Sequence, residues 1–164
     1  MHEHDDDDRP IRDLGELLDG FRFAMVATVV EGTITSRPLT LLEQDGPHLR
    51  FLVAASAPWV EALGRGATVH AAFADTADET YVAVEGFGRV TDDRETIERL
   101  WNPAASAFFE GPEDPEVRAL EVIATGGEWW DGPSSRIGQA FSLLRTKLSA
   151  STPEEEHGAI NPTS

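Results

Sequence analysis

The clearest candidate for chemistry in this sequence is Arg37, which follows a run of strand-forming residues and is held by the restricted backbone of Pro38. An arginine fixed in this way is well placed to grip a phosphate or a carboxylate through two parallel hydrogen bonds. Because the chain is strongly acidic, the same side chain could equally pair with one of the protein's own carboxylates. The residues alone leave both interpretations open.

Large aromatic side chains form the second group of candidates, because several of them lie in or beside predicted loops and helix ends. These are Trp59, Trp101, Phe108, Phe109, Trp129 and Trp130. Amphipathic rings in such places favour a subunit interface or the binding of a planar ligand. The alternative is a small satellite core packed under a loop, and spacing does not separate the two.

The motifs of several enzyme classes and metal sites are missing from the sequence. The five histidines form no helical HExxH pattern, and the glycines form neither GxGxxG nor a phosphate-binding P-loop. No serine stands in a GxSxG motif, and the chain has no cysteine. We therefore expect no metal centre, and hydrolase and kinase activities lack a starting residue.

The elements that must position these candidates are marked by turn signals such as Glu31-Gly32 and Asp45-Gly46. Mostly antiparallel strands are expected over six ranges: 21–30, 33–42, 48–54, 68–74, 80–90 and 117–124. Short helices are expected over 14–18 with Asp13 as the cap, over 57–63, and over 94–101 with Asp92-Asp93 as the cap. A longer helix is expected over 134–148. Gly86 and Gly88 indicate a bulge or a sharp bend. The pattern predicts an α+β protein built on a β-barrel.

Length and charge limit the alternatives. A chain of 164 residues is one domain, expected over residues 13–150, with disordered polar tails at 1–12 and 151–164. Thirteen basic and thirty acidic side chains give a net charge of −17, which predicts no binding to nucleic acid and no polybasic membrane anchor. Neither a secretory signal nor an apolar run of the roughly 20 residues needed to span a membrane is present, so we expect a cytoplasmic protein.

Three segments carry a family resemblance: SRP at 36–38, DDRETIERLWNPA at 92–104 and WWDGPSS at 129–135. With the apolar strands around them, they resemble the general stress protein branch of the pyridoxamine 5′-phosphate oxidase-like family over about residues 13–150. The resemblance implies a six-stranded antiparallel split β-barrel with flanking short helices that works as a homodimer. Members typically hold FMN at the dimer interface, and the flavin usually serves redox chemistry.

The resemblance also assigns cofactor-binding residues. Arg37 matches the family arginine that grips the FMN phosphate, and the strand along the isoalloxazine ring contains Arg37, Pro38, Leu39 and Thr40. The segment 52–59, on the phosphate and ribityl side, supplies Val53, Ala54, Ser56, Ala57 and Trp59. Trp130, in the EWWDGPSSR stretch, is a further cofactor-binding candidate.

The phosphate side departs from the family pattern. Where the branch commonly reads FFTDxDSPKV, this chain reads FLVAASAPWV, with Val53, Ala57 and Trp59 at the Thr, Ser and Lys positions. Ser56 offers a replacement hydroxyl. Each charge-assisted hydrogen bond is worth roughly 1.5–3 kcal/mol, so losing two or three predicts FMN binding weaker by about two to five orders of magnitude.

These observations support competing functions. The first is a flavin-binding oxidoreductase, in which the cofactor carries the electrons and no side chain is identified as an acid or base. The second is a non-catalytic dimeric binding protein for a flavin or another flat ligand, with a degraded FMN-phosphate site. The third is a dimer with no small ligand, whose aromatic side chains pack at the interface.

Overall fold

The computed structural model describes residues 11–132 and 156–162. In chain order these residues form β1 (Ile11–Asp13), α1 (Leu14–Leu18), β2 (Phe23–Val30), β3 (Thr33–Thr40), β4 (Glu43–Asp45), β5 (His48–Ala54), α2 (Pro58–Leu63), β6 (Ala67–Asp75), β7 (Thr80–Thr91), α3 (Arg94–Leu100), the 3₁₀ helix η1 (Pro103–Ala107), β8 (Val117–Asp131) and β9 (Glu156–Asn161).

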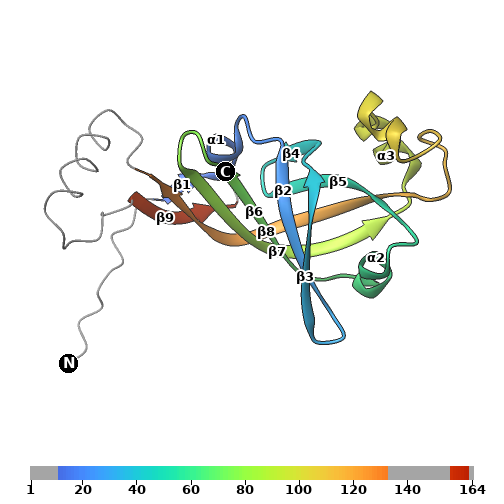
Figure 1. The fold of residues 1–164 in the computed structure, drawn as a ribbon, viewed down its shortest axis with the longest axis horizontal. Coiled ribbons are helices and arrows are strands. Elements are labelled where there is room, and N and C mark those ends of the chain that lie inside the picture. Colours follow the sequence, from blue (N-terminus) through green and yellow to red (C-terminus); the bar gives the residue numbers. More distant parts are fainter. Residues whose placement is uncertain (1–10, 133–155, 163–164) are drawn as a thin grey trace, which may run out of the picture.

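The described strands belong to one mostly antiparallel sheet that curls without closing (Figure 1). Its six longest strands follow the order β3-β2-β6-β7-β8-β5. They correspond to the six strands expected from the sequence, and the short helices flank them. No ladder joins β3 to β5 among the described residues, so the barrel is split on that side. The predicted fold class is confirmed, with three short strands, β1, β4 and β9, added to it.

The longest strand, β8, crosses the whole molecule (Figure 1). Its first half pairs with β5, most of its length pairs with β7, and its end pairs with β9. The strand expected from the sequence over 117–124 is too short, because β8 continues to Asp131. The ladder to β7 continues to Asp131 after a register shift that leaves Thr125 as the extra residue. The irregularity predicted at Gly86 is therefore present beside this residue, with the extra residue on β8, whereas the ladder is regular at Gly88.

Strand β9 corrects the expectation of a tail over residues 151–164. It pairs antiparallel with β8 and parallel with β1, and Ile160 is buried. A short apolar stretch in a polar segment can form a strand when a neighbouring sheet edge is open to pair with it. The helix expected over 134–148 lies outside the described residues.

The short helices begin where the capping residues predict. Asp13 accepts a hydrogen bond from the Glu16 backbone N–H at 3.1 Å and so opens α1. Asp93 caps α3 through the Thr96 N–H. None of the helices in the described part of the chain combines the length and the apolar character that crossing a membrane requires.

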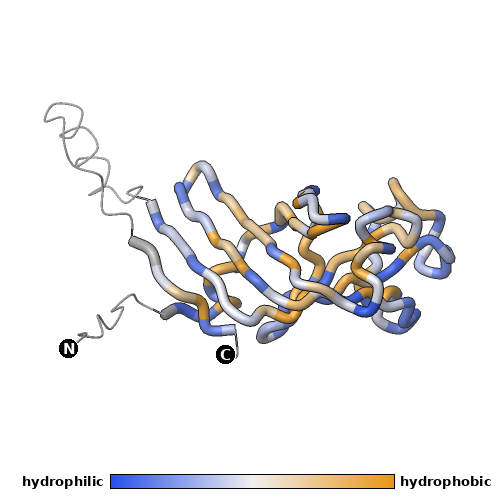
Figure 2. The backbone as a smooth tube through the Cα atoms, turned by 90° about the horizontal axis from the view of Figure 1, so that it is seen from below, coloured by the Kyte–Doolittle hydropathy of each residue, from blue (hydrophilic) through white to orange (hydrophobic). Residues whose placement is uncertain are grey.

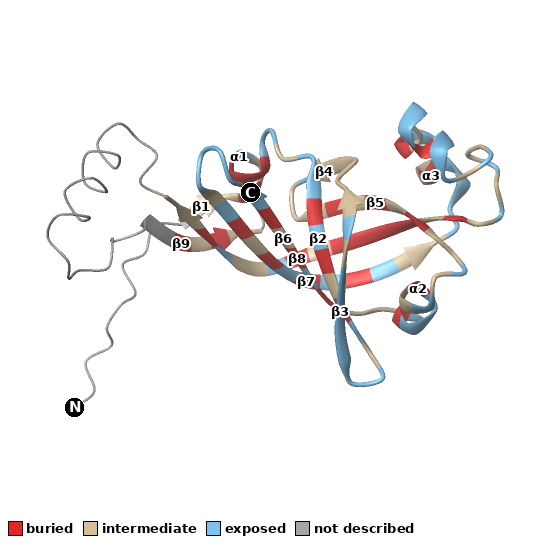
Figure 3. Cartoon of the chain, viewed as in Figure 1, coloured by how far each residue is buried: buried red, intermediate tan, exposed pale blue. Residues whose placement is uncertain are grey.

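The main core lies inside the curled sheet, where alternate residues of the strands are buried (Figure 3). Figure 2 shows the apolar residues along the same strands. Phe51 and Phe73 are among its largest side chains, and Trp129 joins them from β8. A second, smaller cluster lies under α3, where Trp101 and Phe109 pack on buried neighbours. For Trp101, Phe109 and Trp129, three of the aromatic candidates from the sequence, the structure supports core packing. In contrast, β3 is largely exposed (Figure 3).

A buried carboxylate joins three strands beside the main core. Glu121 of β8 accepts hydrogen bonds from Arg50 of β5 at 2.8 Å and from Arg89 of β7 at 2.9 Å. Burial disfavours the charged carboxylate, but the two guanidinium groups outweigh it and hold the pKa of Glu121 below its usual range. His48 Nδ1 lies 3.3 Å from the same carboxylate. The group fixes the side-by-side placement of β5, β8 and β7.

We predict that Gly86→Ala destabilises the protein by about 1–3 kcal/mol, because overpacking in a sheet forces the backbone to move. A Cβ at this position would lie 2.4 Å from the Ile123 carbonyl oxygen, which belongs to the paired backbone of β8. The measurement is the free energy of unfolding in urea.

Gly111→Ala is the matched control, because a Cβ there meets nothing within 4 Å and the glycine needs no positive φ. Equal stabilities of the two variants would contradict the close approach at the bulge.

Candidate functional site

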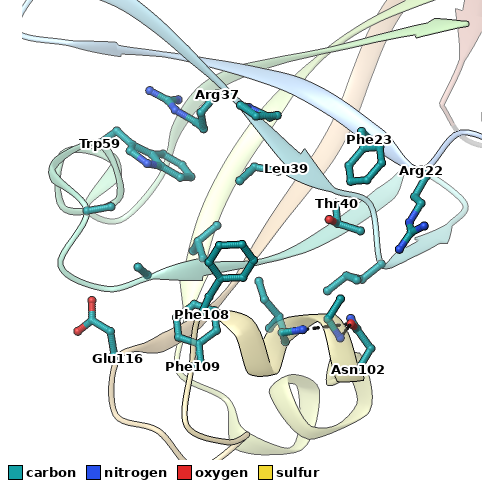
Figure 4. A pocket seen from close by; sticks show the side chains of 18 of the residues that line it. Arg22, Phe23, Arg37, Leu39, Thr40, Trp59, Asn102, Phe108, Phe109 and Glu116 are labelled. Atoms are coloured by element: carbon teal, nitrogen blue, oxygen red, sulfur yellow. Dashed lines mark hydrogen bonds between the residues drawn. The ribbon is translucent and has the colours of Figure 1, made fainter.

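A cavity of about 820 Å³ lies between the open edge at β3, the end of β5, the start of α2 and the region of η1 (Figure 4). Most of its lining is apolar. The lining residues are Arg22, Phe23, Arg37, Pro38, Leu39, Thr40, Leu42, Leu52, Val53, Ala54, Ser56, Ala57, Trp59, Asn102, Ala104, Ala105, Phe108, Phe109 and Glu116. The cavity is thus assembled from segments that are far apart in sequence, with the split of the barrel beside it.

Arg37 lies at one side of this cavity and is held by oxygen atoms of the β2–β3 hairpin. Its guanidinium donates to the Val26 carbonyl at 3.1 Å, to the Thr28 hydroxyl at 2.8 Å and to the Thr35 hydroxyl. No ion pair with a carboxylate forms among the described residues, so the interpretation of Arg37 as an internal ion-pair partner is not supported. Partial burial lowers the pKa of Arg37.

Trp59 covers Arg37 from α2. The Arg37 guanidinium carbon lies 4.3 Å from the centroid of the Trp59 ring, which is close enough for a cation–π interaction. Figure 4 shows the indole below Arg37 on the same side of the cavity, with the apolar side chain of Leu39 beside it. The residue that replaces the family's lysine therefore supplies a flat apolar wall and shields one face of the neighbouring cation.

Glu116, in the loop before β8, contacts the segment 52–59 that the resemblance assigns to the FMN phosphate. Its backbone carbonyl accepts the Ala55 N–H at 2.7 Å, and its carboxylate accepts the Ser56 N–H, also at 2.7 Å. Hydrogen bonds from the Ser56 hydroxyl and then from the Ser56 N–H lower the pKa of Glu116, so this carboxylate is ionised at neutral pH. Ser56, expected to supply a replacement donor, thus already donates its N–H to a carboxylate of the protein itself.

The loop before β8 holds Glu116 in place. The Asp114 carboxylate accepts the Glu116 backbone N–H at 2.8 Å and the Glu110 N–H at 3.0 Å. Arg94, on α3, donates to the carbonyls of Asp114 at 3.0 Å and Pro112 at 3.3 Å. The position of the carboxylate therefore follows from a loop fixed at several points.

The structure brings together nine of the ten predicted site residues, all except Trp130, which does not line the cavity. Trp130 pairs with Tyr81 and His157 in the sheet. It lies twelve residues along β8 from Arg118, the partner of Val53, or roughly 40 Å at about 3.3 Å per residue. In this chain, Trp130 is separated from the predicted cofactor site.

Sequence reasoning missed several lining residues at both ends of the cavity. Glu116 stands in the acidic loop EGPEDPE, where nothing distinguishes it from its neighbours. Arg22 and Asn102 lie at the opposite side of the cavity from Glu116 (Figure 4). Asn102 caps η1 through the Ala104 N–H at 2.9 Å. Asn102-Pro103 follows the end of α3, as is typical of this pair after a helix, and it brings the Asn102 side chain to the cavity.

The cavity lining fits the isoalloxazine ring of FMN but not its phosphate. The volume and the apolar lining suit a planar ring system. The phosphate side offers Val53, Ala57 and Trp59 in place of donors, and the N–H of Ser56 already serves a carboxylate. A phosphate dianion would therefore meet a like charge where the family pattern provides a lysine and hydroxyl groups.

Comparisons with known proteins agree with this fold. The family model described as "Pyridoxamine 5'-phosphate oxidase like" matches residues 9–154. A putative general stress protein 26 from Jannaschia sp. CCS1 superposes with a TM-score of 0.70 at 19% identity, covering 89% of this chain and 94% of that one. At this identity the likeness shows the fold alone.

Two further structures are similar over a shorter range. The general stress FMN/FAD binding protein of Xanthomonas citri gives a TM-score of 0.61 at 28% identity, covering 70% of this chain and 83% of that one. The general stress protein 26 of Bacillus anthracis str. Sterne gives 0.63 at 19% identity, covering 70% and 88%. No curated protein matches the sequence significantly.

We predict that Arg37→Met lowers the free energy of unfolding by about 1–2 kcal/mol, because it removes three hydrogen bonds and leaves the buried Thr28 hydroxyl without its donor. Urea denaturation measures the effect. Arg22→Met is the matched control, since Arg22 lines the same cavity but is exposed, and its change should stay within about 0.5 kcal/mol. A loss at Arg37 as small as the one expected at Arg22 would mean that the hydrogen bonds of Arg37 do not stabilise the fold.

Proposed function

The chain belongs to the pyridoxamine 5′-phosphate oxidase-like family, and from that premise we propose that its cavity binds the isoalloxazine ring of a flavin. Family membership supports a flavin over other planar molecules. A similar structure, from Xanthomonas citri, is called an FMN/FAD binding protein. The single observation that carries the proposal is the apolar cavity of about 820 Å³ at the split of the barrel, walled by Trp59.

The cavity lining offers more contacts to the flavin ring than to the ribityl phosphate tail. Trp59 offers an aromatic face, and Leu39 and Phe108 offer apolar surface toward the same space (Figure 4). Phe108 is 83% exposed in the free chain, so a stacked or edge-on ligand would remove a large apolar side chain from water. These residues would bind and orient the ring and exclude water from it.

Oxidation and reduction would come from the bound flavin, because such cofactors carry the electrons themselves. A flavin-dependent oxidoreductase is therefore the first form of the proposal. A non-catalytic binding protein is the second, and the Glu116 carboxylate favours it because it opposes the phosphate of the family's usual cofactor.

The proposal predicts that the purified protein quenches the fluorescence of added riboflavin with a Kd in about the micromolar range. Trp59→Ala should weaken this binding roughly three- to tenfold, because aromatic contacts contribute about 0.5–1.5 kcal/mol beyond the area they bury. Tyr81→Leu is the control, since Tyr81 is a partly exposed aromatic residue of β7 that does not line the cavity. Absence of quenching by riboflavin and FMN alike would refute flavin binding.

We also propose that the chain forms a homodimer through the outward face of the β2–β3 hairpin. Phe23, Met25, Val29 and Ile34 are 45–74% exposed on these two strands, and Val29 faces Ile34 across the ladder. Monomeric soluble proteins rarely expose contiguous apolar strips of this kind, so a second copy is a natural cover for it. A dimer is also what the family resemblance implies.

Ile34→Glu is expected to shift the protein from dimer to monomer in sedimentation equilibrium, because a buried unpaired carboxylate at the interface is costly. Ala77→Glu adds the same charge in an exposed turn away from the strip and should leave the mass unchanged. A wild-type mass equal to that of one chain would refute the dimer.

A further inference from the structure

We infer that this cavity selects a flavin whose tail lacks a phosphate, and that Glu116 is the residue that enforces the choice. The inference rests on the proposed flavin binding and specifies its ligand class as a riboflavin-like molecule with an uncharged, hydroxylated tail. It depends on three features of the described residues: hydrogen-bond donors that are already used, a cation that is already held, and a fixed carboxylate.

The donors beside the cavity are used by one residue. Ala55 donates its N–H to the Glu116 carbonyl, and Ser56 donates its N–H to the Glu116 carboxylate, both at 2.7 Å. These neighbouring groups follow β5 directly, in the segment that the resemblance assigns to the phosphate. A phosphate would have to displace a fixed carboxylate to reach the N–H of Ser56.

The cation on this side cannot turn freely toward a ligand. Arg37 donates to Val26, Thr28 and Thr35, and the ring of Trp59 covers one face of its guanidinium. The other cation in the described lining, Arg22, lies across the cavity and has its guanidinium 5.3 Å from the Phe23 ring. Neither arginine therefore supplies the free positive charge that the lysine of the family pattern, here Trp59, would bring to a phosphate.

The carboxylate is placed to repel anions and to accept hydrogen bonds. Asp114 adds a second negative charge on the same loop. Arg118 helps to lower the pKa of Glu116 by its positive charge, but the hydrogen bonds of its guanidinium go to the backbone carbonyls of Pro115 and Val117. A phosphate monoester carries about −1.5 to −2 charges at neutral pH, whereas a ribityl chain offers hydroxyl donors. The acidic chain as a whole, at −17, reinforces the preference.

The test is a fluorescence titration of the full chain with riboflavin, lumiflavin and FMN at low and high salt. For the wild-type protein we expect riboflavin to bind at least about tenfold more tightly than FMN at low salt, a difference of about 1.4 kcal/mol. The difference should narrow at high salt, because screening weakens repulsion between partly exposed charges. Lumiflavin, which has the ring without the tail, should also bind, because the apolar lining contacts the ring.

Glu116→Gln keeps the shape of the side chain and removes its charge. The ratio of FMN affinity to riboflavin affinity should rise about tenfold, because the repulsion of the phosphate is removed while the side chain can still accept a hydrogen bond from the tail. Measurable binding of riboflavin also shows that the variant is folded. Glu113→Gln removes a charge from the same loop, at an exposed residue that does not line the cavity, and should leave the ratio of the two affinities unchanged. Ala57→Ser combined with Trp59→Lys should favour FMN further.

The outcomes separate this inference from the function it rests on. If FMN binds the wild-type protein as tightly as riboflavin or more tightly, or if Glu116→Gln changes both affinities equally, the selection against phosphate is wrong and flavin binding stands. If none of the three flavins binds, flavin binding and the inference fail together.

Discussion

The pairing of β8 with β5 and β7 is the constraint on which the rest of this structure depends. Its register sets Ala54 opposite Val117, and the next backbone hydrogen bond joins Ala55 to Glu116. The backbone of Glu116 is thereby placed by the sheet, and the loop before β8 holds it there. Farther along the same strand, Glu121 links β8 to both neighbours through Arg50 and Arg89. A single strand thus positions both the core crosslink and the polar end of the site.

The cavity separates into two parts that can change independently. Apolar residues of β3, α2 and the η1 region form the part suited to a ring, and these follow the hydrophobic pattern that builds the barrel. The polar part consists of a few side chains on loops, among them Ser56 and Glu116, whose replacement leaves the strands unchanged. A fold can therefore be retained while the ligand group recognised at one end differs.

The sequence predicts most of this architecture because strand alternation and turn residues are local signals. The six main strands and the caps at Asp13 and Asp93 were predicted on that basis. The extension of β8 and the existence of β9 depend on partners distant in sequence, so local patterns missed them. Nine residues that line the cavity were predicted by resemblance, whereas Glu116 was not, because its position follows from the register of two strands and a loop that Arg94 holds.

The short parallel ladder between β1 and β9 has a consequence for the connectivity of the molecule. It sets Ile11 opposite Ala159 and Asp13 opposite Asn161, so the first and last described strands are neighbours. These two strands therefore share one edge of the sheet, away from the elements that line the cavity (Figure 1). A circularly permuted chain, joined there and opened at an exposed turn, would preserve every contact of the site.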